Sequence, residues 1–316
     1  MSKFVKSFAY WGTVALFLIS LLFSPEISKT VQDTFNFITT VLFTGIFPFL
    51  LLGCILTELS SNTVVKTKSR IGFAKLFGLP QIAMKLLFVG AFCGFPSGAL
   101  AVKRAYQCNA LTQEEASRLL LFSTLPSPAF CITILGENTW NNRLLGLCVY
   151  LATLCGALTL GFCFNLLSPI TSPSSNNEKF SKNSAIKITS VSEDILNAVK
   201  GAIGAFSRLA GLCFIFRIIW FFAHKIATHL GVKPAVLSTI YCLIDLAGGT
   251  VGFSIFSVDY APYLVTVIFC LQGISVFLQQ YDALRVCKVK ISTFSLFRCF
   301  HTVISLIFLA IFINFL

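Results

Sequence analysis

The chain contains nine stretches of a length and apolarity that suit a membrane crossing, which needs about 20 predominantly apolar residues. They cover roughly residues 7–24, 35–57, 82–102, 119–136, 144–167, 201–223, 235–257, 260–281 and 293–315. Hydrophobic residues make up 56% of the 316 residues and charged residues only 11%, whereas soluble domains carry about 25% charged residues. The sequence therefore predicts an all-α, polytopic transmembrane helical bundle of about nine segments, and it excludes a soluble enzyme.

The net charge of +12 does not indicate nucleic-acid binding, because the basic residues are gathered in short loops rather than on one contiguous face. Such clusters are typical of cytoplasmic loops under the positive-inside rule. The three clusters are Lys66, Lys68, Arg70 and Lys75; Lys225 and Lys233; and Arg285, Lys288 and Lys290.

The first apolar segment follows Lys3 and Lys6 and has no small-residue cleavage site after it, so we interpret it as a retained helix with a cytoplasmic N-terminus. The chain is then expected to be a multi-pass protein of the cell membrane. Alternation places loops 59–81, 224–234 and 282–292 inside, and it places 24–34 and the Asp259 turn outside. The basic loop 103–118 falls outside against the rule, unless the interrupted segments re-enter rather than span.

The 12 cysteines form no Cys-x-x-Cys pair and no cluster with the three histidines. Zinc sites and disulfide frameworks need paired spacings of that kind. Since most of these thiols lie in or beside apolar segments, we interpret them as small hydrophobic residues and expect no metal and no cofactor.

A first interruption lies at Gly94–Gly98, where Gly94, Pro96, Ser97 and Gly98 stand in the middle of an apolar segment. Proline breaks a helix, and in lipid the freed backbone groups must be satisfied inside protein or along a wet cavity. A half-helix starting near Ser97 would offer N–H groups to an anion. The alternative is a kink that lets helices pack closely.

A second interruption lies at Pro126–Pro128, flanked by Ser123, Thr124 and Ser127. It predicts either a re-entrant tip that faces the first interruption or a structural hinge. A role for Ser97 or Ser127 as a nucleophile is not supported, because no histidine is placed beside either serine, and we expect no enzymatic activity.

Arg208 lies near the middle of segment 201–223. A cation at bilayer depth costs at least about 2.5–3.5 kcal/mol and usually faces a protein-lined cavity, so Arg208 is a candidate substrate-binding residue. Arg217, nine residues on, is expected on the opposite helical face, where it reaches the membrane interface. Lys85 and Arg298 are expected to do likewise.

Asp245 is the only acid inside a predicted span, and it precedes a break at Gly248 and Gly249. It is a candidate counter-ion of Arg208, cation ligand or proton carrier, with a fixed structural ion pair as the alternative. Gln272 and Gln279, seven residues apart, are expected on one helical face, where they line the same cavity or bridge helices.

The interruptions recur in the same order at a spacing of roughly 150 residues. Gly94–Gly98 corresponds to Gly248–Gly252, and Phe122–Phe130 corresponds to Phe269–Phe277. Duplicated halves with matching interrupted helices indicate a transporter-like site. The expected organisation is an N-terminal helix (1–30), a first repeat (31–167), a polar linker (168–194) and a second repeat (195–316).

Several of these motifs resemble the YlbJ-like family of sporulation integral membrane proteins, which carry the Gate nucleoside-recognition domain. The similarity runs through Gly90–Leu100, Glu115–Phe130, Leu243–Gly252 and Gln272–Gln280. The chain departs from the family pattern at Phe95, Leu100, Ser127 and Asp245, where the family has tyrosine, lysine, glycine and glutamate. The resemblance implies two Gate-like repeats and a permease that moves dipicolinate, a small dicarboxylate, during spore maturation.

The leading hypothesis is therefore a permease for a small organic anion. The expected partners are a small-molecule substrate and the lipid bilayer, with a homo-oligomer left open and no nucleic acid. A nucleoside permease is a second reading, and a non-transporting membrane scaffold in a sporulation or envelope complex is a third.

Overall fold

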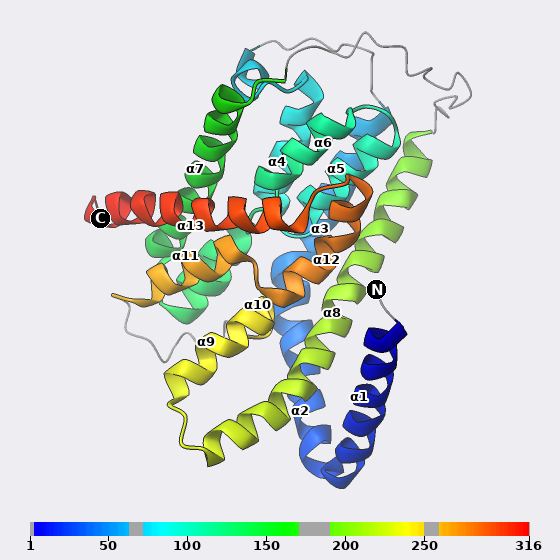
Figure 1. Cartoon of the computed structure of the whole chain (residues 1–316), viewed down its shortest axis with the longest axis vertical. Helices are drawn as coiled ribbons and strands as arrows, with labels where there is room; N and C mark the ends of the chain where they lie inside the picture. The colour runs from blue at the N-terminus through cyan, green and yellow to red at the C-terminus, as the bar shows by residue number, and fades with distance from the viewer. Residues whose placement is uncertain (1–2, 63–71, 171–189, 250–258, 316) are drawn as a thin grey trace.

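The computed structural model describes residues 3–62, 72–170, 190–249 and 259–315. These residues form helices and no strands (Figure 1), which confirms the predicted all-α class. In chain order the helices are α1 (Lys3–Leu22), α2 (Ser24–Phe37), η1 (Ile38–Phe43), α3 (Thr44–Asn62), η2 (Gly72–Phe77), α4 (Gln81–Cys93), α5 (Ser97–Gln107), α6 (Gln113–Phe122), η3 (Phe130–Thr139), α7 (Arg143–Leu167), α8 (Val191–His229), α9 (Pro234–Ile244), α10 (Leu246–Gly249), α11 (Ala261–Leu271), α12 (Gly273–Val286) and α13 (Ile291–Asn314).

Among the described residues, six helical stretches are long and apolar enough to cross a membrane, and they correspond to six of the nine predicted segments. The other three, 82–102, 119–136 and 235–257, are the segments in which the sequence places breaks. They divide into α4 and α5, into α6 and η3, and into α9 and α10. Residues 250–257 of the last segment, most of linker 168–194, and Lys66, Lys68 and Arg70 lie outside the described residues.

Helices α4 and α5 form a helical hairpin, so segment 82–102 turns back on itself. The two helices pack together across the short connection at 94–96. Gly90 and Gly98, four residues on either side of Gly94, lie against each other, and a Cβ atom at Gly98 would stand 2.7 Å from the Cα of Gly90. The chain therefore leaves the hairpin at the end where it entered.

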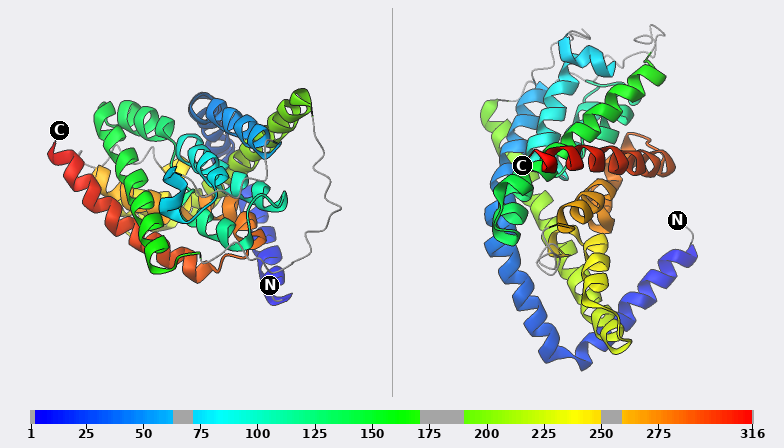
Figure 2. Two further views of the ribbon diagram at one scale, coloured as in Figure 1. Left: turned by 90° about the horizontal axis from the view of Figure 1, so that it is seen from above. Right: turned by 90° about the vertical axis from the view of Figure 1, so that its left-hand side faces the viewer.

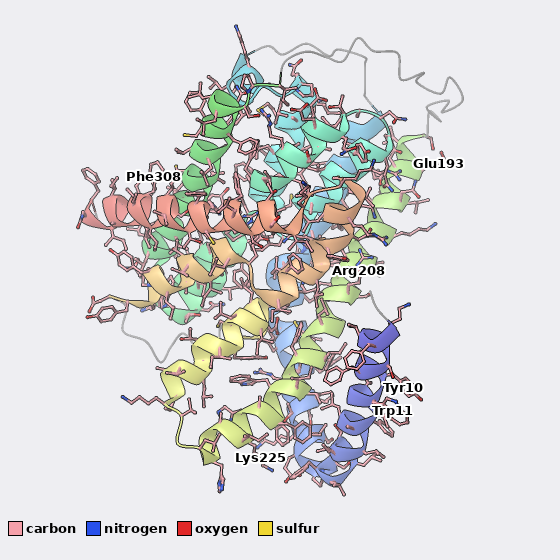
Figure 3. All side chains as sticks on the ribbon, viewed as in Figure 1. Tyr10, Trp11, Glu193, Arg208, Lys225 and Phe308 are labelled. Carbon is pink, nitrogen blue, oxygen red and sulfur yellow. The ribbon has the colours of Figure 1, made fainter. Side chains whose placement is uncertain are left out.

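Two long helical stretches run antiparallel along the molecule (Figure 1). One is the 36-residue apolar run 24–59, which comprises α2, η1 and most of α3, and the other is the 39-residue α8. Lys225 lies 3.9 Å from Glu26 at one end, and Ala202 and Ala205 pack with Leu50 further along. Arg208 stands midway along α8 and Lys225 near its far end (Figure 3).

This arrangement corrects one part of the expected topology. The ion pair between Lys225 and Glu26 puts 224–234 at the same end as 24–34, not at the opposite one. Lys103 pairs with Asp282, so 103–118 and 282–292 share the other end, which also holds Arg104 paired with Glu58. The hairpin is the physical reason. Because segment 82–102 turns back instead of crossing, loop 103–118 lies on the same side as loop 59–81. Each following loop, up to the one after α8, then lies on the side opposite to the expected one.

Four contacts between the two halves of the chain join residues 147 to 149 positions apart. Gln272 bonds Thr124, and His301 bonds the Thr153 carbonyl at 2.8 Å. Gly201 faces the Cys54 sulfur at 3.9 Å, and Gly156 packs directly against Ser305 where α7 crosses α13. These spacings are close to the roughly 150 residues that the sequence predicts between the two repeats.

Helix α1 stands away from the rest of the bundle and contacts mainly α2 (Figure 2). Large apolar side chains such as Phe4, Phe8 and Trp11 are exposed on it, and no residue of its apolar window is buried. An apolar helix without a packed face is suited to a lipid surrounding.

We expect Gly98→Ala to destabilise the protein. The new Cβ atom would stand 2.1 Å from the Ser123 carbonyl oxygen, and overpacking of a tight core site costs about 1–3 kcal/mol. Gly204→Ala is the matched control, because a Cβ atom there meets nothing within 4 Å. Thermal unfolding in detergent measures both, and equal midpoints would contradict the packing described for the hairpin.

The topology predicts that positions 108 and 233 are reached from opposite sides of the membrane. Cys108 is exposed at the end of α5, and Lys233 is exposed between α8 and α9. In a background without other cysteines, Cys108 and the variant Lys233→Cys should react with a membrane-impermeant maleimide from opposite faces of oriented vesicles. Labelling of both from one face would refute the hairpin topology.

Candidate functional site

The first interruption is as sharp as the sequence predicts. Helix α4 ends at Cys93, Gly94 has a left-handed φ of +71°, and the Phe95–Pro96 peptide bond is cis. Helix α5 then begins at Ser97 without a side-chain cap on its first turn. A residue with a Cβ atom would be strained at Gly94. Gly94, Pro96 and Gly98 therefore shape the hairpin tip.

The second interruption lies against this tip, as predicted by the interpretation in which the two interruptions face each other. The Ser123 carbonyl oxygen would stand 1.9 Å from a Cβ at Gly90 and 2.1 Å from one at Gly98. Ser127 packs on Gly94 in the same way, with its N 2.6 Å from a Cβ there. Ser123 and Ser127 are buried, and the Ser127 hydroxyl accepts a hydrogen bond from Phe130 N. Both serines belong to the packing between the two interruptions.

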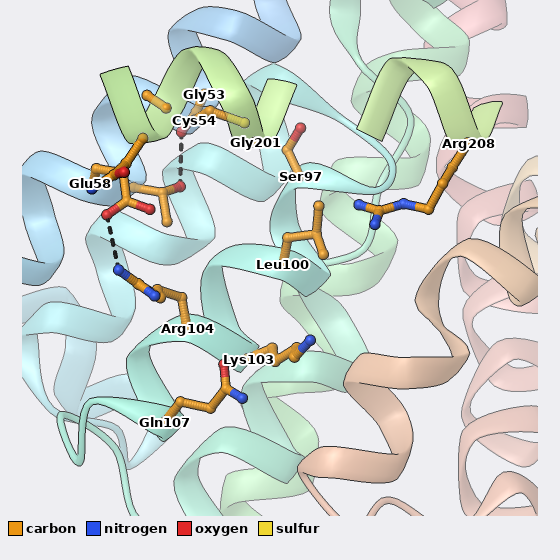
Figure 4. A pocket seen from close by; sticks show the side chains of 13 residues that line it. Gly53, Cys54, Glu58, Ser97, Leu100, Lys103, Arg104, Gln107, Gly201 and Arg208 are labelled. Carbon is orange, nitrogen blue, oxygen red and sulfur yellow. Dashed lines mark hydrogen bonds and ion pairs between the residues drawn. The ribbon is translucent and has the colours of Figure 1, made fainter. Parts of the chain in front are cut away.

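A pocket of about 200 Å³ opens beside the hairpin, between α3, α5 and α8 (Figure 4). Its charged residues are Arg208 from α8, Lys103 and Arg104 from α5, and Glu58 from α3. The remaining lining residues are Gly53, Cys54, Thr57, Ser97, Leu100, Gln107, Asn197, Ala198 and Gly201. Of the residues proposed from sequence, only Arg208 and Ser97 line it.

The pocket has three cationic side chains and one acid, and its cations differ in their pairing. Arg104 lies 3.3 Å from Glu58, and Lys103 lies 2.5 Å from Asp282 on α12. Within the described part of the chain, no ion pair or hydrogen bond holds Arg208. Its guanidinium points from α8 toward Ser97 and Leu100 (Figure 4). Arg208 lines a protein cavity as expected, but it is exposed rather than buried in this chain.

Ser97 supplies a buried hydroxyl to the same pocket. The residue is 3% exposed, and among the described residues its Oγ has no hydrogen-bond partner. A buried hydroxyl without a partner costs free energy, and a polar group of a ligand can supply the missing bond. Arg208 on α8 and Ser97 on α5 thus contribute a charge and an enclosed hydroxyl that have no partner among the described residues.

Asp245, Gly248 and Gly249 lie outside this pocket, at the junction of α9 and α10. The cation that acts on Asp245 is Arg217, not Arg208. The Arg217 guanidinium stands 5.4 Å above the Tyr241 ring. Of the three candidate roles of Asp245, that of counter-ion to Arg208 is therefore wrong, because Arg217 faces the α9–α10 junction from the next turns of α8.

Gln272 lies at the centre of the bundle, where the interruptions of the two halves meet. Its Nε2 donates to the Thr124 carbonyl at 2.9 Å and to the Thr124 hydroxyl at 3.0 Å, and its Oε1 accepts from Gln280 Nε2 at 3.0 Å. Gln272 itself has a left-handed φ of +74° and separates α11 from α12. Because α11 ends and α12 begins at Gln272, the prediction that Gln272 and Gln279 share one helical face is wrong. The residue that contacts Gln272 is Gln280, not Gln279.

Arg298 is a buried arginine, so the prediction that it reaches the membrane interface is wrong. It is 2% exposed rather than extended toward the membrane interface. Its guanidinium donates to the carbonyls of Leu121 at 2.9 Å and Thr124 at 3.2 Å, and it also bonds the Thr124 hydroxyl. Backbone carbonyls freed by a helix break need hydrogen-bond donors inside the protein. The break predicted at Pro126–Pro128 could therefore have indicated that an arginine of an apolar segment is buried against it.

Comparison of the chain with protein families, with characterised proteins and with solved structures yields no match. The resemblance to the YlbJ-like family therefore stays a prediction, and the functional argument depends on the geometry of the site.

We expect Arg298→Met to destabilise the fold strongly. The substitution removes the donors to the Leu121 and Thr124 carbonyls, and each buried polar group left unpaired costs about 1–3 kcal/mol. Arg285→Met is the control, since its side chain is 70% exposed. Thermal unfolding in detergent should show a large loss for Arg298→Met alone; similar midpoints would mean that Arg298 does not hold the break.

Proposed function

We propose that the protein is a multi-pass membrane permease for a small organic anion, and that the pocket between α3, α5 and α8 binds this anion. The observation that carries the proposal is the unpaired guanidinium of Arg208 in a pocket whose other cations already have acidic partners. A fixed, unpaired positive charge in a cavity is suited to a carboxylate, which arginine binds with two parallel hydrogen bonds.

The opposite wall supports the same ligand chemistry. Ser97 offers a buried hydroxyl, and it begins α5, an 11-residue helix whose N-terminal end favours negative charge. The volume of about 200 Å³ suits a small molecule. A dicarboxylate such as dipicolinate, the substrate class that the family resemblance implies, combines these properties and is the first compound to test.

The arrangement of the two halves supports movement of the ligand rather than binding alone. The long stretches around α3 and α8 run antiparallel, and four contacts pair residues about 148 positions apart. We interpret the halves as two inverted Gate-like repeats. In transporters of that design the halves rock against each other around a central site formed by broken helices.

The test is uptake of labelled dipicolinate into proteoliposomes by the wild type and by Arg208→Ala. Loss of a hydrogen-bonded charge contact costs about 1.5–3 kcal/mol, which corresponds to a KM roughly ten-fold or more higher. Lys200→Ala is the matched control, because it removes an exposed cation from the same helix outside the pocket. Uptake that is equal in the wild type and Arg208→Ala would refute the assignment of Arg208.

The same assay separates the other functions. Uptake of labelled uridine without dipicolinate would establish a nucleoside permease, because a nucleoside offers no carboxylate to Arg208. Transport of neither compound by folded protein would favour the scaffold, and a scaffold should also tolerate Arg208→Met without loss of stability.

A further inference from the structure

A second polar site lies at the junction of α9 and α10, apart from the pocket. Asp245 is 0% exposed, between Ile244 at the end of α9 and Leu246 at the start of α10. Tyr241, one turn earlier, is 5% exposed. A Cβ atom on Gly248 would stand 2.5 Å from both Asp245 Oδ2 and the Tyr241 hydroxyl, so the two side chains meet over this glycine.

The two oxygens of the Asp245 carboxyl group differ in their surroundings, and the Ser275 hydroxyl and the Cys213 thiol lie beside the group. Oδ2 accepts from Gly248 N at 3.1 Å. Oδ1 is buried, and no described residue bonds it. The Tyr241 hydroxyl is likewise buried and unbonded within the described chain. A buried carboxylate is costly unless it is paired and hydrogen-bonded.

Charged and titratable groups face Asp245 from two helices. Arg217 and Cys213 come from α8, and Tyr241 and Cys242 come from α9, while Ser275 of α12 adds a hydroxyl. Arg217 is half-buried and lies over the Tyr241 ring, and no ion pair joins it to Asp245 among the described residues. Its positive charge is near but does not neutralise the carboxylate by direct contact.

We propose that Asp245 is a proton-binding site, and that its protonation and release couple the transport of the anion to a proton gradient. The inference rests on the proposed permease function. The proton comes from water on one side of the membrane, binds Asp245 Oδ1 and returns to water on the other side, so no bond of the transported anion changes. A protonated carboxyl has no net charge to bury, so protonation removes the cost of enclosing an ionised Asp245.

The surroundings favour a proton over a metal cation. Sodium and calcium ions need several oxygen ligands, and Ca²⁺ takes six to eight. Near Asp245 the described side-chain oxygens are the hydroxyls of Tyr241 and Ser275, which are too few to complete the ligand set of either ion. A single proton needs one free oxygen, and Oδ1 provides it.

The proton site is connected to the anion pocket through α8. Cys213, which faces Asp245, packs in one apolar cluster with Leu209 of α8, Leu42 of η1 and Ala247 of α10. Arg208 precedes Leu209 directly and faces the pocket. A change of charge at Asp245 therefore acts on the same helix that positions the free guanidinium.

Transport assays separate coupling from binding. With labelled dipicolinate as the probe, the wild type should accumulate it when an inward proton gradient is imposed. Asp245→Asn should lose this accumulation at least ten-fold while it retains exchange of external label for internal unlabelled dipicolinate, because exchange needs no net proton movement. Gradient-driven accumulation that is unchanged in Asp245→Asn would overturn the proposal. Loss of exchange as well would mean that Asp245 serves anion binding or folding instead, and would overturn it too.

An infrared measurement tests the proton site without any transport. The wild type at neutral pH should show the carbonyl band of a protonated carboxylic acid, and Asp245→Asn should lack it. Asp282→Asn is the control and should keep the band, because Asp282 is ionised in its pairs with Lys103 and Arg285. An identical band in wild type and Asp245→Asn would refute the proton site. A wild type with the band but without transport would refute the permease and leave the buried proton established.

Discussion

The structure depends on one constraint, which is that backbone groups released by helix breaks in an apolar setting must find partners inside the protein. The interruption after α6 shows how this is met. Its Thr124 carbonyl receives donors from Gln272 and Arg298, two side chains of the other half of the chain. On its other side, Gly90 and Gly98 leave room for the Ser123 carbonyl to approach the hairpin. The backbone groups of these interruptions are thus bonded or packed by other parts of the protein, and the Thr124 carbonyl already has its hydrogen-bond donors.

The same constraint explains why two arginines of apolar segments, Arg298 and Arg208, have different surroundings. Arg298 is enclosed, and its two terminal nitrogens donate to backbone carbonyls inside the protein. Arg208 faces a cavity and holds no described partner. The sequence places Arg208 near the middle of its apolar segment and Arg298 near the start of its own, which is the reverse of the order of their burial. What distinguishes them is the neighbouring helix, a broken one for Arg298 and the wall of a pocket for Arg208.

Patterns local in sequence were predicted well, and relations between distant segments were not. Glycine and proline placed the breaks at Gly94–Gly98 and Pro126–Pro128 correctly, because these residues act on their own backbone. Whether a broken segment spans or turns back is decided by the contact of Gly90 with Gly98, which no periodicity encodes. The contact of Gln272 with Gln280 instead of Gln279 also depends on a feature that the sequence pattern does not show. Gln272 has a left-handed φ, so α11 ends there and α12 begins with its residues facing other directions.

Helix α8 is longer than a membrane crossing requires. At 1.5 Å per residue, its 39 residues extend about 58 Å, nearly twice the roughly 30 Å of bilayer hydrocarbon. Its first turns carry Glu193, Asp194 and Lys200, a polarity suited to water rather than to lipid tails. Asn197 and Gly201, which line the pocket, belong to this stretch. The lining of the pocket therefore extends from the apolar middle of α8, at Arg208, into the polar first turns of this helix.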